Sequence, residues 1–336
     1  MRLISKLLCS SILVCSSLAA SASSFSSLVI FGDSLSDSGN NSNVPTIGAA
    51  PSQVISGNTY VPGQTYSSAP FGTYSNGPVW ATQFAEMLGL SALPSLLPGG
   101  TNFAFGGART GAGSQVPSLL SQTAMYLGGT GGVADGEALY VVAGGGNNVR
   151  STLETLAISN PATFASIIGA AAWQYAVDIG NIVDSLQSAG AKNIIVWNAP
   201  NLGVVPAVTA QGPEAAYLGS LVSQSFNDML GIRLGFETGV QTFDLFGLAS
   251  QAAAKGFTNT TDACGAASNA AVCPDISTAL FWDGIHPTTA AHRLIAENMF
   301  ATAVPEPETW ALMLAGLGFI TYRARRRAAA PVLAAA

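Results

Sequence analysis

Two short segments near opposite ends of the chain carry side chains suited to nucleophilic catalysis. Ser34 lies in GDSLSDSGN, directly after an apolar run, and Asp283 and His286 lie in DGIHP. A nucleophilic serine needs a base to take its proton and a third group to orient that base. Because Asp283 and His286 are three residues apart on one turn, we expect the carboxylate to hold the imidazole. The alternative is a turn histidine satisfied by backbone groups.

The surroundings of Ser34 also suit this chemistry. Gly32 allows a tight turn after a strand, so that the serine hydroxyl projects from the sheet edge, and the next segment could begin a helix whose N–H groups face an oxyanion. The competing interpretation is that Asp33 and Ser34 only cap a helix. His292, the second of two histidines, falls in a predicted helix and is interpreted as a structural or surface residue.

Alternating strands and helices are predicted to position these segments. Alternation of this kind predicts an α/β fold with a parallel sheet and helices on both faces. In such sheets the site lies at the carboxyl ends of the strands, where glycine-rich turns follow the first three apolar runs. Strands are predicted at residues 27–31, 101–105, 138–143, 193–197 and 240–245, and helices at 78–88, at 152–189 as a pair broken near Asn160-Pro161, at 213–236 and at 290–300.

Four sequence blocks, in order across residues 27–300, resemble the GDSL subgroup of the SGNH hydrolases. The blocks are FGDSLSDSGN, GTNFAFGGA, GGGNN and DGIHP. The resemblance implies a three-layer α/β/α, flavodoxin-like fold and a carboxylic ester hydrolase, an esterase or lipase. It assigns the catalytic triad to Ser34, Asp283 and His286.

The same resemblance places three oxyanion donors. They are the backbone N–H of Ser34, the backbone N–H of Gly107 and the side chain of Asn147, with Gly106 as an alternative to Gly107 because the block can slip by one residue. The family has Asp after that Asn, whereas this chain has Asn148. We expect this difference to alter local hydrogen bonding without abolishing activity. An ordinary turn or a helix cap is the competing interpretation for these positions.

The N-terminal residues 1–22 have the features of a secretory signal peptide. Arg2 and Lys6 precede a serine-diluted apolar stretch at residues 7–18, and Ala20-Ser21-Ala22 forms an A-x-A cleavage site. The mature chain is therefore expected to begin at Ser23, with the hydrolase domain at residues 23–303.

Residues 304–327 resemble a PEP-CTERM sorting segment, followed by a tail at 328–336. The sequence VPEPE precedes an apolar stretch at 310–322 and an arginine cluster. The resemblance implies an exosortase-type processing enzyme as partner and delivery to the periplasm, cell surface or extracellular matrix of a Gram-negative bacterium. Thirteen residues span only ~20 Å of a ~30 Å hydrocarbon core. We therefore expect a transient association of this transmembrane-type segment with the inner membrane; a frayed tail is the alternative.

The composition narrows the remaining function classes. Hydrophobic residues make up 49% of the chain and charged residues 9%. All 18 acidic residues but only half of the 12 basic ones lie between Asp33 and Glu308, an acidic balance that argues against nucleic-acid binding. Cys9 and Cys15 leave with the signal, and in an exported protein Cys264 and Cys273 are expected to pair, with two free thiols as the alternative. No cofactor or metal is expected.

The residues leave more than one activity open. An acyl-enzyme at Ser34 serves an esterase or lipase, and it serves an acyltransferase equally; a non-catalytic surface or exopolysaccharide-binding protein on the same fold is the third hypothesis. The substrate is expected to be a small-molecule, polysaccharide or lipid ester. A polar loop at residues 40–76 carries aromatic side chains that could line an acyl or sugar pocket or pack locally, namely Tyr60, Tyr66, Phe71 and Tyr74.

Overall fold

The short apolar runs of the sequence form a parallel sheet in the computed structural model, which describes residues 25–45, 54–63, 65–304, 314, 316–321 and 323. The residues of the first three strands along the chain are almost all buried, as expected for strands covered on both faces, whereas the fourth strand, at the edge of the sheet, is partly exposed. The strands lie in the order β1-β2-β3-β4, and every pair is parallel. They are β1 (Leu28–Gly32), β2 (Leu139–Ala143), β3 (Asn193–Trp197) and β4 (Val240–Phe243).

A further segment lies along the free edge of β1 without forming a regular strand. The N–H of Phe103 donates to the carbonyl of Ile30 at 2.7 Å, and an isolated parallel bridge joins Asn102 of this segment to Ile30 of β1. The strand expected at 101–105 is therefore reduced to a bridge. The reason is that the N–H of Gly32, which would continue the ladder to the Phe103 carbonyl, donates at 2.8 Å to the side chain of Gln122 instead.

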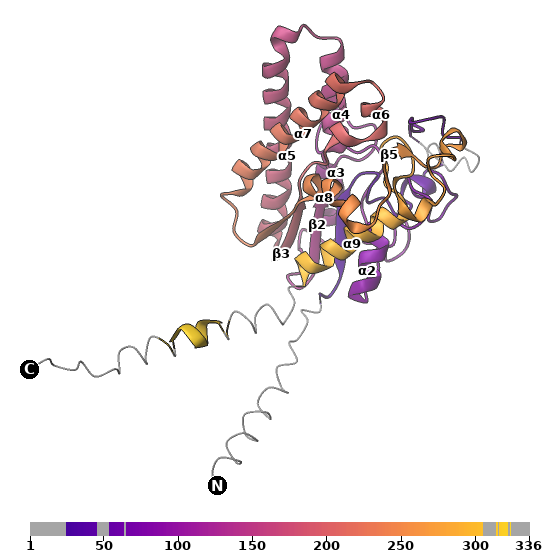
Figure 1. Ribbon diagram of the computed structural model, residues 1–336. Coiled ribbons are helices and arrows are strands. Elements are labelled where there is room, and N and C mark those ends of the chain that lie inside the picture. The colour runs from indigo at the N-terminus through magenta and orange to yellow at the C-terminus, as the bar shows by residue number, and fades with distance from the viewer. Residues whose placement is uncertain are drawn as a thin grey trace, which may run out of the picture. The chain divides into compact units, whose positions relative to one another are not determined.

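Helices cover both faces of the sheet and complete the expected three layers. On one face, α5 (Phe164–Ala189) and α7 (Pro213–Leu234) lie side by side, together with α3 (Leu119–Gly129). Figure 1 shows these helices on one side of the strands and α2 (Trp80–Leu88) and α9 (Thr289–Ala303) on the other. Trp197 of β3 fixes that second face, because its ring lies 4.4 Å from Trp80 and its Nε1 donates to the sulfur of Met299.

Several elements differ from the sequence prediction. The helix pair at 152–189 is present and is broken at Pro161–Thr163, but its first member α4 (Gly146–Ala157) begins six residues early. The helix α3 was not expected. The remaining unexpected elements follow β3 and β4: α6 (Pro206–Thr209), α8 (Leu245–Gln251), and a small parallel sheet of β5 (Asn259–Ala263) with β6 (Ala279–Phe281).

Cys264 and Cys273 are joined by a disulfide, with their Cα atoms 5.5 Å apart. The loop that it closes is bonded to the segment that leads to the predicted base. Cys264 N–H donates to the Phe281 carbonyl at 3.0 Å, and Gly265 N–H donates to the Trp282 carbonyl at 2.7 Å. The disulfide therefore supports the residues immediately before Asp283.

The expected signal peptide lies outside the described residues, as does most of the expected sorting segment. Within 310–322, the structure describes helical residues at 314 and 316–321. No helix among the described residues is long and apolar enough to cross a membrane, so the transmembrane character expected for this stretch is not supported.

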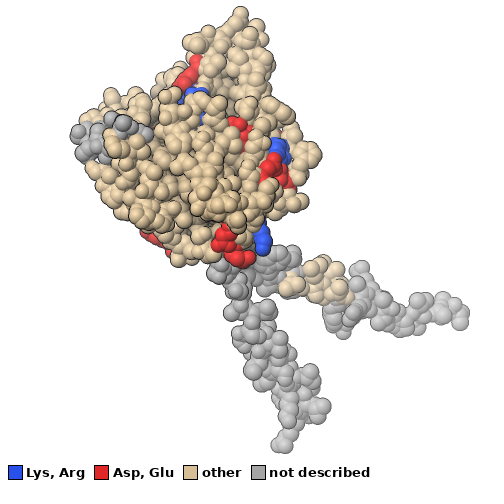
Figure 2. Space-filling view, turned by 180° about the vertical axis from the view of Figure 1, so that it is seen from behind, with Lys and Arg blue, Asp and Glu red and all other residues tan. Residues whose placement is uncertain are grey.

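Charged side chains are sparse on the surface. Figure 2 shows a face made largely of uncharged residues, with a few separated acidic and basic groups. The pairs Lys192–Glu137, at 3.9 Å, and Arg293–Glu297, at 2.9 Å, are both solvent-exposed. Such exposed pairs contribute at most about 1 kcal/mol each, so the fold depends on its apolar core.

Candidate active site

The segment after β1 is a tight turn that places Ser34 at the carboxyl edge of the sheet. Ser36 and Asp37 both donate their N–H groups to the carbonyl of Asp33, at 3.0 Å. No helix begins directly after Ser34, where the sequence would have allowed one, and the next helical residues are Asn41–Asn43. The physical reason is that the Asp37 carboxylate accepts the N–H groups that a helix would have turned toward its own carbonyls.

Asp37 connects the serine turn to the second sequence block. Its carboxylate accepts backbone N–H groups of Gly39 at 2.8 Å, Asn40 at 2.6 Å, Asn41 at 3.2 Å and Gly106 at 3.0 Å. Burial raises the pKa of Asp37 to about 6, and these four donors act in the opposite direction. The carboxylate therefore fixes the relative position of the turns at Ser34 and Gly106.

A glutamine that no motif indicated holds the end of β1. Gln122 of α3 accepts the N–H of Gly32 at 2.8 Å and donates to the carbonyl of Gly32 at 2.9 Å. Gly32 itself is tightly enclosed, since a Cβ added there would lie 2.8 Å from the carbonyl oxygen of Ala143. The serine turn thus leaves the sheet from a rigid point.

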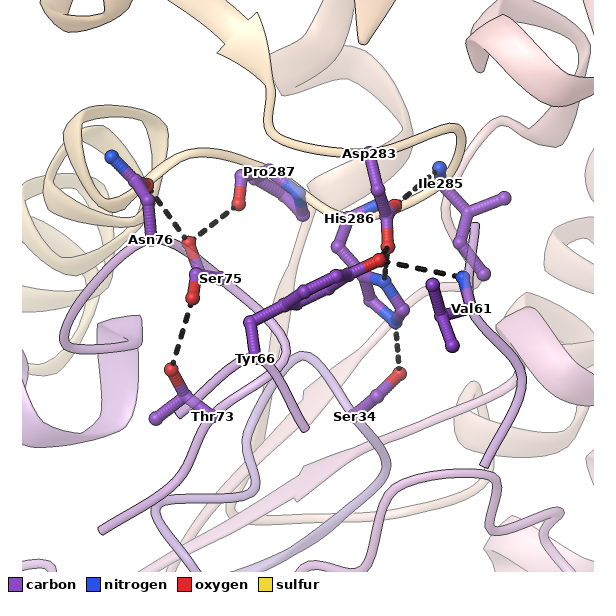
Figure 3. Close-up of polar contacts among 10 residues, drawn as sticks. All are labelled: Ser34, Val61, Tyr66, Thr73, Ser75, Asn76, Asp283, Ile285, His286 and Pro287. Atoms are coloured by element: carbon purple, nitrogen blue, oxygen red, sulfur yellow. Dashed lines mark hydrogen bonds and ion pairs between the residues drawn. The ribbon is translucent and has the colours of Figure 1, made fainter. Parts of the chain in front are cut away.

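The structure brings Ser34, His286 and Asp283 together in one hydrogen-bonded row (Figure 3). Nε2 of His286 lies 2.9 Å from Oγ of Ser34, and Nδ1 lies 2.7 Å from Oδ2 of Asp283. Asp283 is fully buried and His286 is 4% exposed, whereas Ser34 is half-buried. Since Asp283 only accepts when ionised, Nδ1 carries the proton and Nε2 is free to accept from the serine.

Asp33 precedes the serine and is buried beside it. Its Oδ1 accepts the N–H of Leu35 at 3.1 Å. Burial raises the pKa of Asp33 to about 6, and the Leu35 N–H and the nearby charges of His286 and Arg150 lower it. A second acidic group therefore lies close to the predicted nucleophile and base.

The other histidine has a different environment. His292 lies in α9, is 1% exposed, and has an Nδ1 with no hydrogen-bond partner among the described residues. Burial, followed by the charge of His286, lowers the pKa of His292 to about 3. It is a neutral buried residue. Across the described parts of the chain, no three His, Cys, Asp or Glu side chains are arranged to hold a metal ion.

The predicted oxyanion donors differ in whether their N–H groups are already used by other hydrogen bonds. Gly106 spends its N–H on Asp37, whereas Gly107 is exposed and its N–H has no recorded partner in the described residues. Gly107 has φ +88°, a conformation that favours glycine. A Cβ on Gly106 would lie 2.1 Å from the Tyr74 ring. Asn147 donates one amide proton to the Ala108 carbonyl at 3.0 Å, which leaves its second proton available.

Asn148, where the family pattern has Asp, forms its own local network. Its Oδ1 accepts the N–H of Thr110 at 3.1 Å and its Nδ2 donates to Thr110 Oγ1 at 2.9 Å. That hydroxyl donates onward to Asp178 at 2.8 Å. The Asn148 amide therefore donates to the Thr110 hydroxyl oxygen, while the hydroxyl proton is used in the hydrogen bond to the buried Asp178 carboxylate.

An apolar pocket of about 110 Å³ opens beside Ser34. Its walls come from the β3–α6 connection, α8, β6 and α9, and include Leu202, Val205, Leu248, Phe281 and Ile295. A wider groove of about 540 Å³, with Tyr60 in its wall, shares Arg150, Leu202 and Ile285 with this pocket. Tyr66, Phe71 and Tyr74 line neither of these two spaces, so of the two alternatives left open for the loop aromatics, pocket lining applies here to Tyr60.

Comparison with known proteins decides the family. Residues 28–299 match the family described as GDSL-like Lipase/Acylhydrolase. The chain belongs to this family. A GDSL esterase/lipase of Arabidopsis thaliana is 27% identical, over 82% of this chain and 88% of its own length. The esterase EstA of Pseudomonas aeruginosa is 29% identical, over 84% of this chain and 47% of its own length.

Among solved structures, an extracellular lipase of Streptomyces rimosus is similar with 15% identity and a TM-score of 0.46, over 82% of this chain and 99% of that one. Residues 303–327 match the PEP-CTERM protein-sorting motif. Membership of the GDSL family supports an ester-hydrolysing function, and the sorting motif indicates export in a Gram-negative bacterium with exosortase processing.

Proposed function

We propose that the protein is an exported serine esterase that hydrolyses carboxylic esters through an acyl-enzyme. The hydrogen-bonded row of Ser34, His286 and Asp283 carries this proposal. Ser34 Oγ attacks the ester carbonyl carbon while His286 Nε2 takes the hydroxyl proton and Asp283 orients the ring. The tetrahedral intermediate collapses, and His286 returns the proton to the leaving alcohol. Water, deprotonated by the same nitrogen, then releases the acid.

The oxyanion of each tetrahedral intermediate is assigned to three donors: the N–H groups of Ser34 and Gly107 and the amide of Asn147. Gly107 is preferred to Gly106 because the Gly106 N–H already binds Asp37. Donors held in place before the reaction stabilise the developing charge without reorganisation. We therefore expect removal of this amide in Asn147→Ala to lower kcat by about 10²–10³-fold with little change in KM.

The apolar pocket beside Ser34 supports an apolar acyl group as the substrate's acid part. The neighbouring groove, which shares Arg150, Leu202 and Ile285, gives room for the alcohol part. The same groove would hold an acceptor alcohol, so an acyltransferase reaction remains the second candidate. Product analysis with an added alcohol separates the two, because a transferase yields a new ester whereas a hydrolase yields only the acid.

The deciding test is hydrolysis of p-nitrophenyl acetate, butyrate and laurate by the purified protein. We expect turnover in the parent, a loss of about 10⁴-fold or more in Ser34→Ala, and the smaller loss given above in Asn147→Ala. The proposal would be contradicted if the folded parent hydrolysed none of the three esters, or if the Ser34→Ala variant kept full turnover. The first outcome would favour a binding protein on this fold.

We also propose the domain boundaries and the route of export. The signal peptide at 1–22 is removed, and the hydrolase domain at 23–303 is followed by a sorting segment at 304–327 that contacts the inner membrane only until it is processed. The match to the PEP-CTERM motif supports this route, and the destination is the periplasm, cell surface or extracellular matrix.

A further inference from the structure

The carboxylate of Asp283 has four hydrogen-bond donors, and one of them comes from a distant part of the chain (Figure 3). Oδ1 accepts the N–H groups of Ile285 at 2.8 Å and His286 at 2.7 Å. Oδ2 accepts from Nδ1 of His286 at 2.7 Å and from the hydroxyl of Tyr66 at 2.5 Å. The first three donors belong to the turn that carries Asp283, whereas Tyr66 lies 217 residues earlier.

Tyr66 is held in place by its own contacts. Its N–H donates to the Thr73 carbonyl at 2.9 Å, and its ring packs edge-on against Trp282 with centroids 5.9 Å apart. The Val61 N–H approaches the hydroxyl oxygen at 3.4 Å. Because a phenol has one proton, the hydroxyl that accepts from Val61 has its proton left for Asp283.

The segment around Tyr66 also binds the Asp283–His286 turn on both sides. Gly284 N–H donates to the Thr59 carbonyl at 2.7 Å. Beyond the histidine, Ser75 Oγ donates to the Pro287 carbonyl at 2.8 Å, and Asn76 accepts the N–H of Thr289 at 2.8 Å. The turn is therefore fixed to this segment before and after His286.

We propose that Tyr66 is a positioning residue of the triad, whose hydroxyl fixes Oδ2 of Asp283 in the orientation that receives Nδ1–H of His286. The inference rests on the proposed esterase function. An aspartate carboxylate has a broad terminal torsion, and Oδ2 has one other donor, the imidazole itself, which moves charge during the reaction. A second, uncharged donor on Oδ2 keeps this oxygen in place while the imidazole gains and loses its proton.

A purely structural role for Tyr66 predicts different behaviour. In that case the hydroxyl only satisfies a buried carboxylate, so its loss lowers stability and leaves the kinetics of folded molecules unchanged. The positioning role lowers kcat, because His286 must be oriented in both acylation and deacylation. It leaves KM unchanged, because Tyr66 lines neither the pocket nor the groove beside Ser34.

The pH dependence of kcat/KM gives a second readout. The Tyr66 hydroxyl draws negative charge from Oδ2, so its removal leaves a stronger counter-charge beside the imidazolium. The acid limb of the profile should then move to higher pH, by about half a unit. The other titratable or charged groups around the pair are unchanged by this substitution; they are Asp33 on the serine turn, Tyr74 on the same segment as Tyr66, Arg150 on α4 and His292 on α9.

The test compares the purified parent with Tyr66→Phe and Tyr126→Phe on p-nitrophenyl butyrate across pH. Tyr126→Phe is the matched control, because it also removes a buried tyrosine hydroxyl that forms a hydrogen bond, here with Tyr140 at 2.8 Å. Tyr126 lies on α3 and packs in the hydrophobic core rather than against the triad. We expect kcat to fall about tenfold in Tyr66→Phe, with KM within about twofold and the acid limb shifted upward, and no kinetic change in Tyr126→Phe. Unchanged kcat and pH profile in folded Tyr66→Phe would overturn the inference.

A second variant covers the case in which Tyr66→Phe does not fold. Site-specific 3-fluorotyrosine at position 66 keeps the ring and the hydroxyl but makes the hydroxyl a stronger donor, so the acid limb should move to lower pH. An unmoved limb would overturn the inference. Ser34→Ala is measured in parallel, and full turnover in this variant would refute the proposed function itself. If Ser34→Ala loses turnover while the Tyr66 variants keep the kcat and pH profile of the parent, only the role of Tyr66 is refuted.

Discussion

Asp33 lies between the strand end and Ser34, with 3% of its surface exposed. Its pKa is raised from the ordinary 3.8 to about 6, mainly by burial. The folded chain therefore binds this proton more tightly than the unfolded chain between about pH 4 and pH 6. Because the folded state binds more protons in that window, Asp33 makes the free energy of unfolding fall as pH rises through it.

Replacing Asp33 by Asn should remove this dependence. The amide cannot ionise, yet its oxygen can still accept the Leu35 N–H. From pH 4 to pH 7, the free energy of unfolding of Asp33→Asn should rise relative to the parent by up to about 3 kcal/mol, since each pKa unit corresponds to about 1.4 kcal/mol. Urea denaturation of both proteins at several pH values measures the difference.

The pKa of Asp37 is raised in the same direction, but Asp37 is present in both the parent and Asp33→Asn. Its contribution to the pH dependence of unfolding therefore cancels when the two proteins are compared. A difference between parent and variant that does not change with pH would contradict the role assigned to Asp33.

At the residue scale, the sequence motifs identified the residues proposed to carry the reaction, but they did not identify the residues that hold those residues in place. Ser34, Asp283 and His286 could be predicted to meet because each lies in a block with a chemical reason for its residues. Gln122 and Tyr66 could not be found this way. Both act through long-range contacts, with Gly32 and Asp283 respectively, and neither has a local sequence pattern that sets it apart.

At the element scale, α8 forms one wall of the pocket beside Ser34. Ala249 on this helix lines the pocket and is half-buried. In Ala249→Phe the ring should occupy space that a long acyl chain needs. We expect kcat/KM for p-nitrophenyl laurate to fall about tenfold or more while acetate changes by less than about twofold, because a filled apolar pocket discriminates by chain size.

Ser250→Phe is the control for this prediction, since Ser250 is the next residue of α8 and is exposed. It adds the same ring outside the pocket and should leave the ratio of laurate to acetate unchanged. An equal loss on both esters in Ala249→Phe would show that the acyl chain binds elsewhere.

Elements with a strong local signal could be predicted, and those fixed by tertiary contacts could not. β3 was placed at its observed bounds because its apolar run is flanked by clear turn residues. The sequence at 145–147 looks like a turn, but Gly145, at φ +126°, allows α4 to begin at Gly146 and places Asn147 in its first turn. β5 has the polar sequence NTTDA and exists because it pairs with β6.

At the scale of the whole molecule, the sequence indicates a chain whose two ends are removed or processed. We expect the protein recovered from outside the cytoplasm of a Gram-negative host to begin at Ser23 and to end near the Pro-Glu-Pro motif at 305–307. Intact-mass measurement of the fractionated protein checks both ends. A host without exosortase is the control and should retain the C-terminal segment.

The same measurement can contradict the export proposal. A full-length mass recovered from the cytoplasm, in a host that processes other proteins carrying the motif, would show that the terminal segments are not used as sorting signals.

The hydrogen bond between Ser34 and His286 spans 252 residues of chain. We expect so long a loop to close late in folding, because its entropy must be overcome before the contact forms. During synthesis the serine emerges among the first residues of the fold and its base among the last. We therefore expect a chain that terminates or is cut before His286 to keep the proposed nucleophile but to lack the proposed base, so that such an incomplete copy does not hydrolyse esters.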